Sequence, residues 1–148
     1  MPFFHDQDRG GLRRLYVEAW RKHRAGRPLE PLEHQIVTVI EQHPEYHALL
    51  EDEAEALGRD FAPEAGQSNP FLHMGLHLAI REQAATDRPA GIAAIRAQLV
   101  ERLADPHEAE HRMLERLAEA LWLSQRTGQP PDEGAYVESL RQMLGRRK

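Results

Sequence analysis

The chain has 148 residues, contains no cysteine and carries a formal net charge of -5 at pH 7. This length suits one domain with its own hydrophobic core, so a single domain over residues 1–148 is expected. The lack of cysteine excludes disulfides, thiolate metal sites and cysteine nucleophiles, which leaves nitrogen and oxygen ligands for a metal ion. The mild charge gives no reason to expect a nucleic-acid partner.

The N-terminal sequence MPFFHDQDRGG lacks the basic start and apolar run of a signal peptide. No apolar stretch approaches the roughly 20 residues that a membrane-spanning helix needs. We therefore expect a cytoplasmic protein without a membrane partner, and the pattern carries no information on its oligomeric state.

Helical spacing of apolar residues begins in the first half of the chain. The pattern predicts helices over 12–24 and 32–42, and Gly26 ends the first of them. Pro44 interrupts the second or starts a new turn, and residues 46–57 are expected to continue as helix. Residues 58–68 are predicted to form a loop.

Two strong helix starts follow in the second half. Asn69-Pro70 predicts a helix to about residue 85, and Asp105-Pro106 predicts one to about residue 126, where Gly128 ends it. Further helices are expected over 90–104 and from Asp132 to about 144. The predicted fold class is all-α, a helical bundle of about four longer helices with short accessory helices, in the style of hemerythrin and ferritin. Trp20 and Trp122 are expected to anchor helix packing.

Three pairs of histidines at i, i+4 spacing stand out within these helices. They comprise six of the nine histidines in the chain, namely His43/His47, His73/His77 and His107/His111. Residues four apart lie on one face of a helix, so each pair could grip a metal ion. Each pair also extends an apolar stripe, which predicts that all three face the core. Buried imidazoles need hydrogen-bond partners or a metal, and six of them favour a metal centre.

Two carboxylates extend the histidine pattern. Glu51 follows His47 by four residues, and Glu115 follows His111 by four. These residues could hold two metal ions and are too many for one tetrahedral zinc. The predicted ligands are therefore His43, His47, Glu51, His73, His77, His107, His111 and Glu115.

The order of these ligands resembles hemerythrin-like bundles, which bind a di-iron centre through histidines and two carboxylates. The intervals are longer here, and the third pair has a second histidine where that family places a carboxylate. The first hypothesis, which rests on the three histidine pairs with Glu51 and Glu115, is a dinuclear centre of iron or manganese, with zinc as a further possibility. Oxygen or peroxide chemistry, or metal storage or sensing, would be the corresponding activity.

Two alternatives remain open from the sequence. The segment HEAEH also matches H-E-x-x-H, in which His107 and His111 would bind zinc and Glu108 would act as general base in a hydrolase. The predicted fold lacks the strand edge that such peptidases use to align a substrate. A metal-free interaction module, with histidines that serve structure or pH sensing, is the third hypothesis.

Most of the chain resembles one bacterial family of unassigned function. The segments AWRKHRAGRPLEPLE with HPEYHALLE, GQSNPFLHMGLHLAIREQ with DRPAGI, and HEAEHRMLERLAEALWLSQRTGQPPD carry the resemblance to domain of unknown function 1841. It implies that the three histidine pairs, Glu115 and Glu119 belong to the family pattern. Arg81 departs from that pattern, because an acidic residue is expected there.

Overall fold

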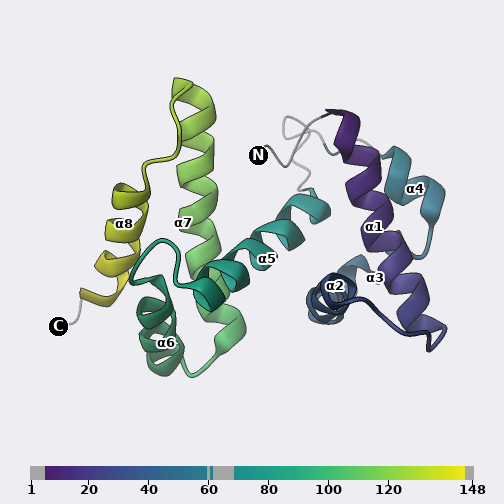
Figure 1. Cartoon of the computed structure of the whole chain (residues 1–148), viewed down its shortest axis with the longest axis horizontal. Coiled ribbons are helices and arrows are strands. Elements are labelled where there is room, and N and C mark those ends of the chain that lie inside the picture. Colours follow the sequence, from purple (N-terminus) through teal and green to yellow (C-terminus); the bar gives the residue numbers. More distant parts are fainter. Residues whose placement is uncertain (1–5, 60, 62–68, 146–148) are drawn as a thin grey trace. The chain divides into compact units, whose positions relative to one another are not determined.

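The computed structural model describes residues 6–59, 61 and 69–145, and all regular elements in these ranges are helical (Figure 1). This confirms the predicted all-α class. The α-helices are α1 (Asp6–Arg24), α2 (Pro31–Glu41), α3 (His47–Leu50), α4 (Glu53–Gly58), α5 (Pro70–Thr86), α6 (Ile92–Leu103), α7 (Pro106–Thr127) and α8 (Glu133–Gly145). A short 3-10 helix, η1 (Pro44–Tyr46), precedes α3.

The helices gather into two compact units, Met1–Gly75 and Leu76–Lys148. Helix α5 begins in the first unit and ends in the second. The single domain expected for residues 1–148 stays a prediction, and the two units are described separately below.

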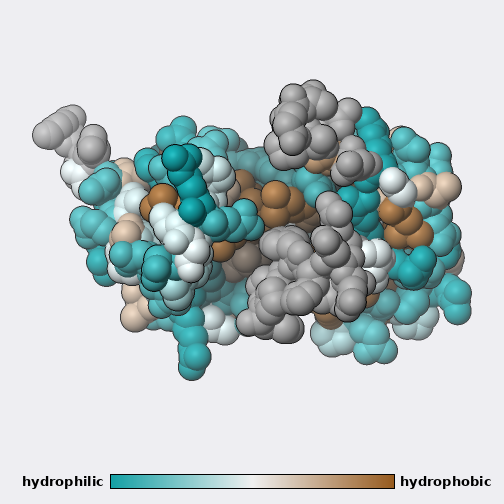
Figure 2. Space-filling view, turned by 90° about the horizontal axis from the view of Figure 1, so that it is seen from above, coloured by the Kyte–Doolittle hydropathy of each residue, from teal (hydrophilic) through white to brown (hydrophobic). Residues whose placement is uncertain are grey.

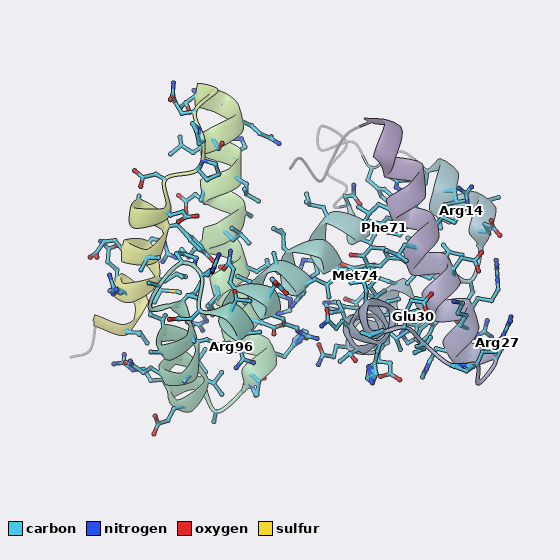
Figure 3. All side chains as sticks on the ribbon, in the orientation of Figure 1. Arg14, Arg27, Glu30, Phe71, Met74 and Arg96 are labelled. Atoms are coloured by element: carbon cyan, nitrogen blue, oxygen red, sulfur yellow. The ribbon has the colours of Figure 1, made fainter. Side chains whose placement is uncertain are left out.

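In the first unit, α1 packs against α2, α3 and α4. Phe71 and Met74, labelled in Figure 3, lie on the first turns of α5, and the Phe71 ring meets the Tyr16 ring edge-on at 5.6 Å. Trp20 is buried, as predicted for a packing anchor. The apolar core of this unit is formed mainly by Tyr16, Val17, Trp20, Ile36, Val39, Ile40, Leu50, Phe71 and Met74.

The stretch around Pro44 differs from its prediction as one helix over 46–57. Helix α3 ends at Leu50, and α4 begins at Glu53 with Asp52 as its N-cap, whose side chain accepts a hydrogen bond from the Glu55 amide at 3.2 Å. An N-cap residue has extended rather than helical backbone angles, so Asp52 separates the two helices. The prediction of a continuous helix was wrong because this local side-chain bond competes with the helix.

In the second unit, α6, α7 and α8 pack against one another and against the later turns of α5. The core is formed by Leu76, Ile80, Ile92, Ile95, Leu99, Ala109, Met113, Leu114, Leu117, Tyr136, Val137, Leu140 and Leu144. Asp105 caps α7 by accepting hydrogen bonds from the amides of His107 and Glu108. Gly128 ends α7 in the left-handed region at φ 74°, which confirms both predicted ends of this helix within a residue or so.

Trp122 does not anchor a core, although the sequence predicted that it would. Its side chain is 56% exposed, and the guanidinium of Arg126 lies over its ring. The buried stripe of α7 passes through Met113, Leu114 and Leu117. Trp122 lies off this stripe, since five residues after Leu117 correspond to about 500° of rotation, or 140° away.

Hydrophilic side chains dominate the face of the molecule seen in Figure 2. Among the helices of the described residues, none combines the length and the apolar composition that crossing a membrane requires.

Candidate metal centre

Three of the predicted ligands meet in the second unit: His77 from α5, and His107 and His111 from α7. A ring nitrogen of each lies within 4.8 Å of a ring nitrogen of the other two. The His107 and His111 rings are nearly perpendicular with centroids 4.4 Å apart, and the His77 centroid lies 5.2 Å from His107 and 4.8 Å from His111. We call these residues the histidine trio.

Local structure explains how α7 presents two members of the trio. The Asp105 cap and Pro106 place His107 in the first turn, and His111 follows one turn later on the same face. His77 is fully buried in α5, next to the core position Ile80. The trio therefore brings together the first turns of α7 and the buried face of α5.

A buried carboxylate orients the His77 ring. Glu110, only 3% exposed, accepts a hydrogen bond from His77 Nδ1 through Oε1 at 2.7 Å. An ionised carboxylate can only accept hydrogen bonds, so Nδ1 must carry the proton. In the neutral imidazole the lone pair is then on Nε2, the nitrogen that a metal ion would use.

Arg81, which lies on α5 like His77, binds the same carboxylate. Its Nε donates to Glu110 Oε2 at 2.9 Å, and its Nη2 donates to Oε1 at 3.0 Å. Burial alone would raise the pKa of Glu110, but the hydrogen bonds from His77 and Arg81 and the Arg81 charge outweigh it and lower the pKa to about 2. Glu110 is therefore an anion at neutral pH.

This depressed pKa predicts acid sensitivity of the metal-free protein. A carboxyl with a pKa of about 2 when folded and 4.5 otherwise stabilises the fold above pH 4.5. That contribution, about 3 kcal/mol, is lost as the pH falls from about 5 to 2. Urea unfolding at several pH values would measure the free energy of unfolding of wild type and of Glu110→Gln. The difference between the two proteins should become smaller as the pH falls over this range. A gap that stays constant with pH would contradict the assignment.

Sequence reasoning missed Glu110, although a signal was present. The predicted stripe on this helix ran through His107, His111 and Leu114, whereas the buried face runs through Glu110, Met113, Leu114 and Leu117. Both histidines consequently lie at the edge of that face and are half-buried. Glu110 stands at i, i+3, i+4, i+7 spacing with Met113, Leu114 and Leu117. A charged residue at this position among core residues was the available clue.

His43 and His73 lie together in the first unit. Their ring centroids are 5.1 Å apart and the rings are nearly perpendicular, while the Tyr46 ring stacks on His43 at 5.4 Å. His43 is buried, and its Nδ1 bonds to the Val39 carbonyl oxygen at 2.8 Å. A carbonyl oxygen only accepts, so this bond also leaves the lone pair of a neutral ring on Nε2.

His47 and Glu51 lie against Trp20 in the first unit. The His47 ring centroid is 4.5 Å from that of Trp20, and its Nε2 donates to the Ile40 carbonyl at 2.9 Å. Glu51 accepts a hydrogen bond from Trp20 Nε1 at 3.1 Å and lies 3.5 Å from Arg24. His43, His47 and Glu51 do not stack on one face of a single helix, because η1 separates His43 from α3.

The remaining carboxylates on α7 point to the surface. Glu115 is exposed, and Glu108 forms an ion pair with Arg112 at 3.1 Å in which both side chains are about half exposed. This arrangement gives no support to Glu108 as a general base beside a zinc-bound water. The sharing of one centre by all eight predicted ligands stays a prediction from the sequence.

Comparison with known proteins places the chain in a family without a known activity. The family model described as domain of unknown function (DUF1841) matches residues 8–142. Neither a curated protein nor a solved structure matches the chain. Because the match covers nearly the whole sequence, the chain belongs to the DUF1841 family.

Proposed function

We propose that this protein binds a transition-metal ion through His77, His107 and His111. The observation that carries the proposal is the histidine trio, in which Glu110 holds the His77 proton on Nδ1. A histidine that binds a metal typically donates its other ring N–H to a carboxylate, and this bond fixes the tautomer and orients the ring. His77 and Glu110 form such a pair.

The chemistry of three adjacent imidazoles favours a cation between them. Protonating two of these rings would place like charges within 4.8 Å of each other in a partly buried site. Neutral rings avoid that repulsion and present lone pairs that a single ion can share. An ion at about 2.1 Å from each nitrogen holds the ligands about 3.4 Å apart, so small side-chain rotations would complete the site.

We propose iron as the natural occupant, with manganese or zinc as alternatives. Imidazole ligands suit iron and zinc, and the chain has no thiolate to compete. Three protein ligands leave coordination positions open for water or a small molecule. Oxygen or peroxide chemistry, as in hemerythrin-like bundles, is the activity we propose, with metal storage or sensing as the second candidate. The second ion of a dinuclear centre rests on the sequence pattern.

Replacing one member of the trio should sharply weaken metal binding. We expect His111→Ala to lower the affinity for Co²⁺, a spectroscopic substitute for Fe²⁺ and Zn²⁺, by at least about 100-fold. Equilibrium dialysis and visible absorption of tag-free protein would measure the loss. His34→Ala is the matched control, since His34 is exposed on α2. Equal affinities of His111→Ala and wild type would overturn the proposal and favour a metal-free interaction module.

A further inference from the structure

Glu110 lies behind the His77 ring, on the side away from an ion bound by the histidine trio. Its Oε1 accepts a hydrogen bond from His77 Nδ1 at 2.7 Å, whereas the nitrogen that would bind the ion is Nε2, across the ring. Glu110 therefore acts on such an ion through the ring and not by direct contact. A carboxylate that accepts the Nδ1 proton makes the imidazole a stronger electron donor at Nε2.

A second charge lies behind Glu110, because Arg81 binds the same carboxylate. Arg81 follows His77 by four residues on α5, so both side chains lie on one face of the helix and reach Glu110 together. The oxygen that accepts from His77 also accepts from Arg81 Nη2 at 3.0 Å, and the other oxygen accepts from Arg81 Nε at 2.9 Å. This fork draws electron density from the carboxylate and weakens its hold on the His77 proton.

Burial lets these charges influence the ion although they do not touch it. His77 is fully buried and Glu110 is 3% exposed, so the interaction between carboxylate and ring is weakly screened. Arg81 is only partly exposed and is separated from the His77 ring by one carboxylate. Its positive charge therefore also acts on the proposed metal site.

Resting on the metal-binding function proposed above, we propose that Glu110 and Arg81 together set the oxidation state that iron prefers at the histidine trio, with opposite contributions. The Glu110 carboxylate favours Fe³⁺, because negative charge and a stronger His77 donor both stabilise the higher charge of the ion. The Arg81 guanidinium favours Fe²⁺, since it adds positive charge and limits the donation from His77. Both are positioning residues, because they act through His77.

A redox titration of iron-loaded protein tests this inference. Under argon, a dye of known potential takes one electron from bound Fe²⁺, which leaves Fe³⁺, and absorption spectra measure the two species. The ratio of Fe³⁺ to Fe²⁺ at a fixed potential compares two ions in the same protein. Any cost that a substitution imposes on the metal-free protein applies to both ions and cancels in this ratio.

The two single substitutions should move this ratio in opposite directions. Arg81→Gln removes a positive charge and should raise the ratio about tenfold, whereas Glu110→Gln removes a negative charge and should lower it about tenfold. In Arg81→Gln/Glu110→Gln the two effects cancel, and the ratio should lie within about threefold of the wild-type value. Arg81→Lys keeps the charge and should do the same.

Arg112→Gln is the matched control for the loss of a positive charge. Arg112 lies next to His111 on α7, but its ion pair with Glu108 is about half exposed, so this variant should change the ratio by less than about threefold. A shift as large as that of Arg81→Gln would show that net charge, and not the bonded pair behind His77, sets the ratio.

Other outcomes would also overturn the inference. A ratio that moved in the same direction in both single variants would leave Glu110 and Arg81 with a structural role only. Each variant has its own predicted direction, so an unchanged or reversed ratio in either one is decisive even if the other fails to fold. Wild-type protein that binds Co²⁺ but no iron would overturn this inference alone, whereas protein that binds neither ion would overturn the proposed function.

Discussion

Glu110→Ala is expected to destabilise the metal-free protein by about 3 to 5 kcal/mol. The substitution removes the acceptor of three hydrogen bonds, from His77 and from Arg81, in a site where Glu110 is only 3% exposed. The substitution takes the carboxylate acceptor away from the Nδ1–H of His77, which is fully buried, and from the guanidinium of Arg81, which is partly exposed. The loss should therefore exceed that of an ordinary surface substitution several-fold.

Chemical denaturation followed by circular dichroism would measure this effect. Glu108→Ala is the matched control, because Glu108 lies two residues earlier on α7 and its ion pair with Arg112 is exposed. That control should change the free energy of unfolding by no more than about 0.5 kcal/mol. Equal effects of the two substitutions would contradict the structural importance of the Glu110 network.

Removing the metal ion that we propose to bind at the histidine trio is expected to lower the stability of wild-type protein by about as much as Glu110→Ala does. A ligand present at about a thousand times its Kd stabilises the folded state by about 4 kcal/mol. For a chain of this size, that corresponds to a fall in Tm on the order of 10 °C after chelation. The reason is that the trio is assembled only in the folded protein, so the ion binds the folded state preferentially.

Calorimetric scans with and without a chelator would measure the shift. His111→Ala, which lacks one member of the histidine trio, should show a much smaller shift in Tm, because an affinity about 100-fold weaker would leave only about 1 kcal/mol of the stabilisation. His34→Ala should retain the wild-type shift. A wild-type Tm that does not respond to exhaustive chelation of the reconstituted protein would argue for histidines with a purely structural role.

The helices could be predicted because their ends depend on local chemistry. Asn69 accepts a hydrogen bond from the Phe71 amide at 2.9 Å, as expected for the cap that opens α5. The two ends of α7 are likewise set locally. The Asp105 side chain caps the first turn through hydrogen bonds, and Gly128 ends the helix in the left-handed region. The break at Asp52 was missed because a capping bond there competes with helix continuation, and helical spacing alone does not register it.

The site was only partly predictable, because its key contacts join different helices. Spacing on α7 identified His107 and His111, and spacing on α5 identified His77, all members of the trio. The bonds from His77 and Arg81 to Glu110 connect residues about 30 positions apart. No pattern within one helix reveals such a pairing, although a charged residue in an apolar stripe indicates that a partner must exist.

Elemental analysis by mass spectrometry tests the central claim most directly. Protein purified without a histidine tag would be reconstituted with Fe²⁺ in the absence of oxygen, passed over a desalting column and analysed for iron, manganese and zinc. We predict about one metal ion per chain, or about two if the second ion suggested by the sequence also binds. The variant with alanine at His77, His107 and His111 should retain almost none. Wild-type protein that holds no metal after reconstitution, or a triple variant that holds as much as wild type, would contradict metal binding by the histidine trio.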